Sequence, residues 1–339
     1  MVSGMKVKTL VSTLVIGSFI ATQALAWGAA GHRMIGEEAM RGLPSYLPAF
    51  LRTPSAIANV GEFSREPDRM RGASKPGDND RLPAHYINLD TDAKIFGLTL
   101  DALPANRTDY DVKVRAAGGD PFDAGYLPYA MADAYAQVAK DMGYWRVLSL
   151  MEQRETDKAK KAWYRADRIR REEVMLRDIG ILSHYMGDAS QPLHVTSHYN
   201  GWGKGENPDG YTTDPIHGPF EGVFVNHNIT TTDVRARMGA YTPCTMKPEQ
   251  CLDAEILQAN AQVVPLYKMQ KAGELVDGNA DMKAFVATQL GMGATSLRNA
   301  LVDAWRDSKS IKVGYPAFVY DDFLAGKVEN PWVSLYGGD

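Results

Sequence analysis

The chain has 339 residues, of which 45% are hydrophobic and 23% charged, and its formal net charge is -4 at pH 7. This composition is typical of a globular protein with a full core, and the length allows one large domain or two smaller ones. An acidic chain does not hold nucleic acid by its overall charge. Any attraction for a polyanion must therefore be local, from metal ions or a few arginines.

The N-terminal segment has the three parts of a secretory signal. Two lysines precede an apolar run over residues 9–20, and the small-residue sequence ALA follows at residues 24–26. The apolar run is too short to span a bilayer, so an uncleaved anchor is the weaker alternative. We expect a signal peptide cleaved after Ala26, a mature chain of residues 27–339 that begins at Trp27, and export to the periplasm or the medium.

Apolar residues recur at helical spacing in four segments, and strand-like alternation is sustained nowhere. The segments are His32–Leu43, Tyr129–Met142, Lys160–Asp188 and Asp281–Asp307. Two long stretches rich in Gly, Pro and Asp, residues 71–83 and 198–219, are expected to be loops, and loops of this length are usually functional. We predict that residues 27–339 form a single all-α domain whose site lies where helices and loops meet.

Cys244 and Cys251 are the only cysteines. In an oxidising compartment they can close a short disulfide loop, and a pair of free thiols is the alternative. Two cysteines this close do not make a structural zinc site, which usually needs four thiolate or imidazole ligands.

Three potential metal ligands lie at the end of the third predicted helix. His184 and Asp188 are four residues apart and so share one helical face, and His194 follows just after the turn that Pro192 imposes. This spacing alone is a weak signal, because a surface or capping pair is more common than a metal site.

Other histidines also lie beside carboxylates. His217 and Glu221 are again four apart, His85 follows Asp68 in the chain, and His32 lies five residues after the expected mature N-terminus. Five of the seven histidines are thus potential ligands. Mixtures of imidazole and carboxylate suit a zinc ion that keeps one position open to water. A single histidine is usually an ordinary core or surface residue, but this explanation is improbable for five histidines together.

The stretch HYMGDASQPLH, residues 184–194, resembles the superfamily of bacterial zinc-dependent phospholipases C and fungal single-strand-specific zinc nucleases (the S-one/P-one nucleases). The resemblance covers most of the span from Trp27 to Glu221, and beyond it only the helical character agrees. It implies a helical fold with long loops, a trinuclear zinc site between helices and loops, and hydrolysis of phosphodiester bonds by a zinc-dependent enzyme.

Residue by residue, the resemblance implies three zinc ions as cofactors. The first would be held by Asp68, His85, His184 and Asp188. Asp188 would bridge to a second, held also by His32 and by the amino nitrogen and carbonyl oxygen of Trp27. The third would be held by His194, His217 and Glu221.

The resemblance also implies two catalytic residues. Asp68 would orient the attacking water, and Arg71 has the spacing of an arginine that stabilises charge on the phosphate in the nucleases, where a planar guanidinium suits phosphate oxygens. An ordinary surface arginine is an equal alternative, since Arg65, Arg69 and Arg81 are nearby.

The substrate class is divided between two readings. The short spacing from Trp27 to His32, together with Asp68 and Arg71, looks like the nucleases, and Tyr86 and Asn88 stand where those enzymes stack and hydrogen-bond a base. Glu221 is instead of the phospholipase type. We expect an exported phosphodiesterase, most consistent with a single-strand-preferring nuclease acting on nucleic acid or nucleotides. The alternative substrate is phospholipid, and no stable protein partner is implied.

A zinc-storing or structural protein without turnover is the remaining alternative. Such sites are usually closed by four protein ligands, whereas these sets leave positions open.

Overall fold

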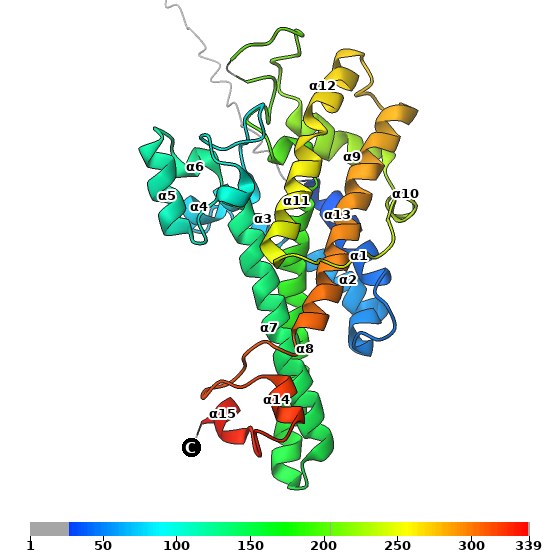
Figure 1. The fold of residues 1–339 in the computed structure, drawn as a ribbon. Coiled ribbons are helices and arrows are strands. Elements are labelled where there is room, and N and C mark those ends of the chain that lie inside the picture. The colour runs from blue at the N-terminus through cyan, green and yellow to red at the C-terminus, as the bar shows by residue number, and fades with distance from the viewer. Residues whose placement is uncertain (1–26, 204, 338–339) are drawn as a thin grey trace, which may run out of the picture.

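Two long helices joined by residues 155–157 form the axis of the fold (Figure 1). They are α7 (Leu127–Arg154) and α8 (Lys158–Ala189), which pack against each other. The structure, a computed structural model, describes residues 27–203 and 205–337. The predicted signal peptide, residues 1–26, therefore lies outside the described residues.

The described part of the chain is helical, with isolated bridges in place of strands. This confirms the predicted all-α fold class. The remaining helical elements are α1 (Gly28–Arg41), η1 (Ala49–Arg52), α2 (Pro54–Phe63), α3 (Glu66–Arg69), α4 (Lys75–Arg81), η2 (Pro83–His85), η3 (Leu100–Ala102), α5 (Arg107–Ala116), α6 (Pro121–Ala124), η4 (Pro192–His194), η5 (Pro219–Phe224), α9 (Val225–Asn228), α10 (Thr231–Arg235), α11 (Pro248–Asn260), α12 (Val263–Lys271), α13 (Ala280–Asp307), α14 (Tyr320–Leu324) and α15 (Trp332–Tyr336).

The main core lies around the C-terminal half of α8. Helices α1, α2 and α13 pack against this half, and α1 also packs against both α2 and α13. Their contact surfaces are apolar, with Ile35, Val60, Ile179 and Leu290 fully buried. Because the last turns of α8 are enclosed by other helices, polar side chains on them are taken out of water and need partners.

Three of the four predicted helices end within a few residues of their predicted ends. The second, predicted over Tyr129–Met142, is in fact α7 and continues to Arg154. Gly143 lets the C-terminal segment approach α7 closely, because a Cβ at this position would lie 3.3 Å from the carbonyl oxygen of Ser308. Beyond it, α7 buries apolar residues against the C-terminal segment, and this tertiary packing maintains the helix.

The loop predicted over residues 71–83 was partly wrong, because it contains helix α4. The Ser74 side chain caps this helix by accepting a hydrogen bond of 3.1 Å from the Gly77 amide, and Pro76 occupies the first turn. These are ordinary helix-start residues, which the polar composition obscured. The stretch 198–219 is irregular over most of its described length, as predicted.

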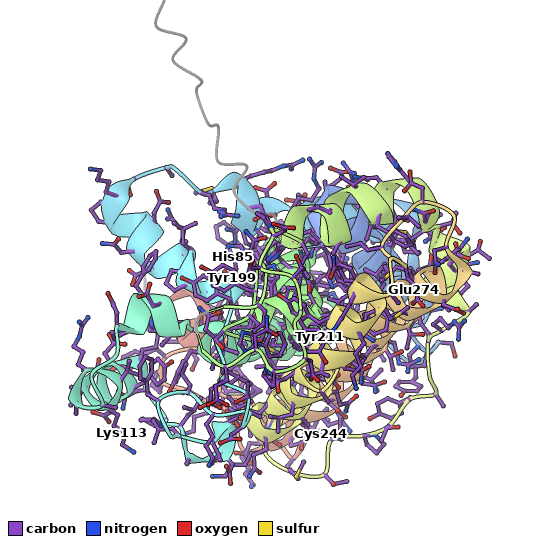
Figure 2. All side chains as sticks on the ribbon, turned by 90° about the horizontal axis from the view of Figure 1, so that it is seen from above. His85, Lys113, Tyr199, Tyr211, Cys244 and Glu274 are labelled. Carbon is purple, nitrogen blue, oxygen red and sulfur yellow. A yellow bond between two sulfur atoms is a disulfide. The ribbon has the colours of Figure 1, made fainter. Side chains whose placement is uncertain are left out.

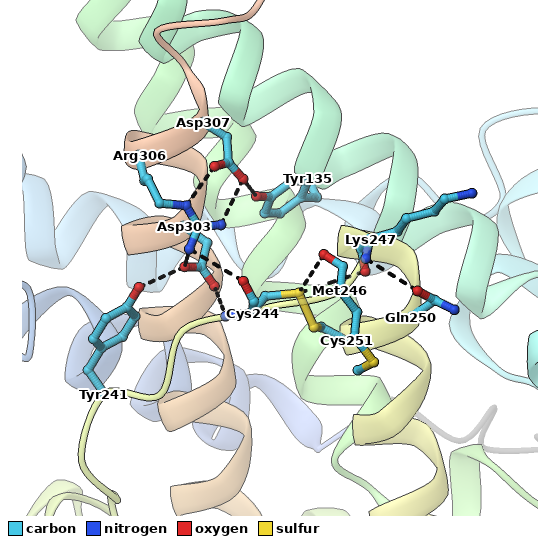
Figure 3. Close-up of a disulfide and its surroundings, with 10 residues drawn as sticks. All are labelled: Tyr135, Tyr241, Cys244, Met246, Lys247, Gln250, Cys251, Asp303, Arg306 and Asp307. Atoms are coloured by element: carbon cyan, nitrogen blue, oxygen red, sulfur yellow. Dashed lines mark hydrogen bonds and ion pairs between the residues drawn. A yellow bond between two sulfur atoms is a disulfide. The ribbon is translucent and has the colours of Figure 1, made fainter.

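The predicted disulfide between Cys244 and Cys251 is present (Figure 3). Asp303 of α13 holds the same segment, because its carboxylate accepts hydrogen bonds from the Cys244 amide at 2.9 Å and the Tyr241 hydroxyl at 2.7 Å. The segment that leads into α11 is therefore held on α13 by one backbone amide and one side-chain hydroxyl.

None of the helices in the described part is both long and apolar enough to cross a membrane.

Helices α2 and α8 cross so closely that only glycine fits at residue 180. A Cβ on Gly180 would lie 2.4 Å from the Cβ of Phe63 and 2.7 Å from its carbonyl carbon. We expect Gly180→Ala to lower the free energy of unfolding by about 1–3 kcal/mol, because overpacking moves backbone here. Chemical denaturation measures the loss. The control is Gly222→Ala, whose added Cβ would meet no atom within 4 Å, and an equal loss in both variants would contradict the packing argument.

Candidate metal centre

A buried carboxylate, Asp188, lies among four histidines from four different elements. Its Oδ2 is 3.2 Å from His85 Nδ1 of η2 and 3.3 Å from His184 Nε2 of α8, one helical turn earlier. Its Oδ1 is 3.5 Å from His32 Nε2 of α1 and 3.7 Å from His194 Nδ1 of η4. Asp188 is fully buried, so these imidazoles take the place of solvent around its charge.

The local sequence explains how α8 brings His194 back to Asp188. Helix α8 ends at Ala189, Pro192 starts the short helix η4, and the Gln191 side chain accepts a hydrogen bond of 2.6 Å from the Leu193 amide. The chain turns within this distance because proline cannot continue the helix. His194 is thereby returned to the carboxylate side of α8.

Three groups of side chains in the described part could each hold a metal ion, since their ligand atoms lie within 4.8 Å of one another. They are His85, His184 and Asp188; His32, Asp68 and His184; and His194, His217 and Glu221. The third group is the one that the family resemblance implies for one zinc. Asp68 lies with His32 and His184, whereas the resemblance places it with His85 and Asp188.

Backbone carbonyls orient three of the imidazoles. Nδ1–H of His184 donates to the Ser64 carbonyl at 2.7 Å, that of His194 to His85 at 2.6 Å, and that of His217 to Tyr199 at 2.8 Å. A carbonyl can only accept, so each ring carries its proton on Nδ1 and presents an Nε2 lone pair. Metal-ligating histidines are commonly held in this way.

The lone pairs so presented face other acceptors. His217 Nε2 is 2.7 Å and His194 Nε2 3.5 Å from the same carboxylate oxygen of Glu221, and His184 Nε2 is 3.3 Å from Asp188 Oδ2. Acceptors that converge on acceptors repel unless a proton or a cation lies between them. A divalent cation satisfies several at once, so the donor set fits a metal ion.

Electrostatics point the same way. Burial lowers the pKa of His184 to about 4 and lowers that of His85 well below its usual value. Burial also raises the pKa of Asp188 well above its usual value, and the negative charges of Asp68 and Glu221 act in the same direction. The protein alone therefore disfavours charge on these groups, whereas a bound cation would favour the ionised carboxylate.

Glu221 lies in η5, a π-helix, which is a rare geometry that occurs mostly at functional sites. Its carboxylate also accepts a hydrogen bond of 3.1 Å from the side-chain amide of Gln191, a fully buried residue. Gln191 thus fixes Glu221 while it also shapes the turn after α8. Gln191 is not among the residues predicted from the sequence, although its position between the ligands Asp188 and His194 was a usable signal.

Trp27 is anchored beside the ligands by its side chain. Its fully buried indole donates a hydrogen bond of 3.0 Å to the Ser190 hydroxyl and packs against Phe220. Gly31 permits this placement, because a Cβ there would lie 2.8 Å from the Trp27 Cβ. The backbone of residue 27 is therefore held between the end of α8 and η5.

A cavity of about 330 Å³ opens onto the cluster, and the ligands His85, His194 and His217 line it together with Tyr199. In Figure 2, His85 and Tyr199 are labelled next to each other. Arg71 also lines the cavity and donates a hydrogen bond of 3.3 Å to Asp68. The structure thus brings a guanidinium group to the same opening as the imidazoles. A larger cavity of about 710 Å³ lies beside the disulfide, and none of its lining residues belongs to the three groups.

Tyr86 and Asn88 line the same cavity. The Tyr86 hydroxyl donates to the Phe122 carbonyl at 2.7 Å, and the Asn88 amide donates to the Asp123 carbonyl at 2.6 Å. The hydroxyl of Tyr86 and the amide nitrogen of Asn88 are therefore both hydrogen-bonded to the backbone of helix α6. The Tyr86 ring forms part of the cavity lining, and the amide oxygen of Asn88 is buried without a hydrogen-bond partner among the described residues.

The two remaining histidines lie outside the three groups, as expected from the sequence. His198 is buried and stacks on Trp202 at 3.9 Å between ring centroids, and His227 is exposed and pairs with Asp277 at 2.8 Å. Trp202 and Tyr211, two aromatic residues of the stretch 198–219, are buried against Tyr267.

No model of a known protein family matches the sequence, and no curated protein is detectably similar to it.

We expect zinc to raise the melting temperature of the chelator-treated protein, because an ion bound only to the folded state stabilises it by about 4 kcal/mol at a thousand times its Kd.

His217→Ala should lower the bound zinc by about one equivalent per chain, since its group has only three protein ligands. Calorimetry and elemental analysis measure both effects. His227→Ala is the control, and an equal loss of zinc from it would contradict the assignment.

Proposed function

We propose that the protein is a zinc-dependent phosphodiesterase, and most specifically a single-strand-preferring nuclease. The observation that carries the proposal is the set of three neighbouring ligand groups, two of which share His184. The third adjoins Asp188 through His194, and His85, His194 and His217 line one cavity. Three protein ligands in each group leave coordination positions for water and substrate, which distinguishes this arrangement from a closed structural or storage site.

Three zinc ions are proposed as cofactors. His194, His217 and Glu221 would hold one of them. His85, His184, Asp188 and Asp68 would hold a second, and His32 with Asp188 and the backbone of Trp27 a third, as the family resemblance implies. Trp27 supplies an amino ligand only in a chain that starts there, so this part of the proposal also requires removal of the leader.

When bound, zinc would supply Lewis-acid chemistry, lowering the pKa of a coordinated water and neutralising charge on a phosphodiester. Arg71 binds the phosphate through its guanidinium and stabilises the charge that builds up on its oxygens. Asp68 holds Arg71 in place by accepting its hydrogen bond, and it orients the attacking water. The carbonyls of Ser64, Tyr199 and His85 keep the imidazoles aimed at the cluster.

Nucleic acid is preferred over phospholipid because of the cavity beside Arg71. Tyr86 and Asn88 line the same cavity as Arg71, and an aromatic ring with a neighbouring amide suits stacking and hydrogen bonding of an unpaired base. The phospholipase alternative rests on Glu221, the carboxylate type of that branch. Leu82, Phe122 and Leu193, which also line the cavity, are compatible with either substrate.

An exported location is part of the proposal. Disulfides persist in oxidising compartments, and the Cys244–Cys251 bond supports the leader that the sequence predicts.

The proposal is tested by turnover of the zinc-loaded protein on single-stranded DNA or RNA and, in parallel, on phosphatidylcholine vesicles. We expect nucleotide release that stops with a chelator and returns with zinc. Release of phosphocholine alone would establish the phospholipase alternative. No turnover on either substrate, with zinc fully bound, would overturn the phosphodiesterase proposal.

Arg71→Ala should lower kcat by about a hundredfold with zinc content unchanged, because it removes a preorganised cationic donor from the reacting phosphate. The matched control is Arg69→Ala, two residues away, whose guanidinium pairs with Glu66 at 2.6 Å on the surface. That exposed pair contributes little, so its kcat should stay within about twofold. Equal kinetics in the two variants would remove Arg71 from the site.

A further inference from the structure

The end of the α7–α8 pair opposite to the metal ligands protrudes from the rest of the fold, with α14 and α15 packed beside it (Figure 1). A second apolar cluster holds it together, including Val147, Leu148 and Tyr164 of the long helices and Phe318 and Phe323 of the C-terminal segment. This end therefore has a core of its own that fixes the surface above it.

The first half of α8 is strongly basic within an acidic chain. Residues 158–171, KAKKAWYRADRIRR, contain seven lysines and arginines and one aspartate. At physiological salt, charges more than about 8 Å away are screened, so the charges close to this end determine the potential there. The positive N-terminal end of a long helix adds to it.

The four arginines of this stretch lie within ion-pair distance of carboxylates, Arg165 at 3.8 Å from Glu152, whereas its lysines do not lie so close to any described carboxylate. Arg168 and Arg171 form ion pairs with Glu152 and Asp141 at 2.6 and 2.7 Å. Arg170 lies 3.9 Å from Asp167, and Asp157 caps α8. In contrast, none of the three lysines at positions 158, 160 and 161 has an ion pair with any residue that the structure describes.

Exposed apolar side chains adjoin these lysines. Trp163 is 51% exposed, Tyr315 88% and Val333 56%. Trp332 contacts both Trp163 and Lys160, with 6.5 Å between the indole rings and 5.2 Å to the ammonium, and the Tyr315 amide donates to the Ser334 carbonyl, so these residues adjoin one another. Lys158 and Lys161 lie in the first turn of α8, where side chains lean toward the helix N-terminus and so toward the protruding end. We call Lys158, Lys160, Lys161, Trp163, Tyr315 and Val333 the tip surface.

We propose that the tip surface binds the face of a membrane rich in anionic phospholipid. Lysines would contact the lipid phosphates, while Trp163, Tyr315 and Val333 enter the headgroup region, where amphipathic aromatic rings are favoured. The charge complementarity and the protruding shape together select this partner, since a convex end fits a flat surface.

Single-stranded nucleic acid fits the tip surface less well. Proteins bind it in grooves whose aromatic rings stack on bases, whereas this end protrudes and includes the aliphatic Val333. Residue 161 also lies about 35 Å from His184 along α8 at 1.5 Å per residue. A strand held at the tip would have to cross that distance to reach the metal ligands.

The test is co-sedimentation of the full chain with vesicles of phosphatidylcholine alone and with added phosphatidylglycerol. We expect binding only to the anionic vesicles, weakening as salt rises. Each lysine near such a surface contributes roughly fivefold in partitioning, so the Lys158→Gln, Lys161→Gln double variant should bind about 25-fold more weakly. The control pair is Lys75→Gln, Lys113→Gln, at exposed lysines of α4 and α5, which should bind like the unchanged protein.

Tryptophan emission locates the contact. Anionic vesicles should shift the emission of the unchanged protein to shorter wavelength, and Trp163→Phe, which keeps an aromatic ring against Trp332, should lose that shift. Melting temperatures and zinc content unchanged in all variants exclude misfolding as the cause.

Equal binding to both vesicle types, or full binding by the double lysine variant, would overturn the proposal. Loss of affinity for a single-stranded oligonucleotide in that variant, with no vesicle binding by the unchanged protein, would instead make the tip a nucleic-acid surface. The proposal does not depend on the phosphodiesterase assignment, because vesicle binding and tryptophan emission are measured without turnover.

Discussion

The burial of one carboxylate, Asp188, imposes most of the other features of the centre. A fully buried carboxylate is costly unless cations or donors surround it, and here four imidazoles from four elements do so. Burial lowers the pKa of His85 and of His184, so these two imidazoles do not readily supply the compensating charge as protons. A divalent cation would resolve the conflict, which is why the geometry is most simply understood as a metal centre.

The scaffold around Asp188 depends on close contacts between helix backbones. Gly180 brings α2 against α8, and this places the Ser64 carbonyl where it orients the His184 ring. Gly31 brings Trp27 against α1, and the Trp27 indole reaches Ser190 just after α8. Small residues thus set the ligand positions indirectly, by setting how near the helices approach each other.

The long helix α8 has different roles along its length. Its C-terminal turns are enclosed and carry the ligands, whereas its N-terminal half is exposed, basic and joined to a separate apolar cluster with the C-terminal segment. The basic stretch of α8 is thus separated from the candidate metal centre by the length of the helix. At physiological salt, the charges in the rest of the acidic chain are largely screened over such distances.

Local pattern was sufficient for the features that depend on nearby residues. Helical periodicity predicted four of the long helices, the spacing of His184 and Asp188 placed both on one face, and the two cysteines could close their loop only with each other. Other features depend on contacts distant in the chain: the extension of α7 by the C-terminal segment, the clamp of Gln191 on Glu221, and the grouping of Asp68 with His32. Periodicity reports which face of a helix is apolar, but packing decides which faces meet and how closely, and ligand atoms must match to within a few tenths of an ångström.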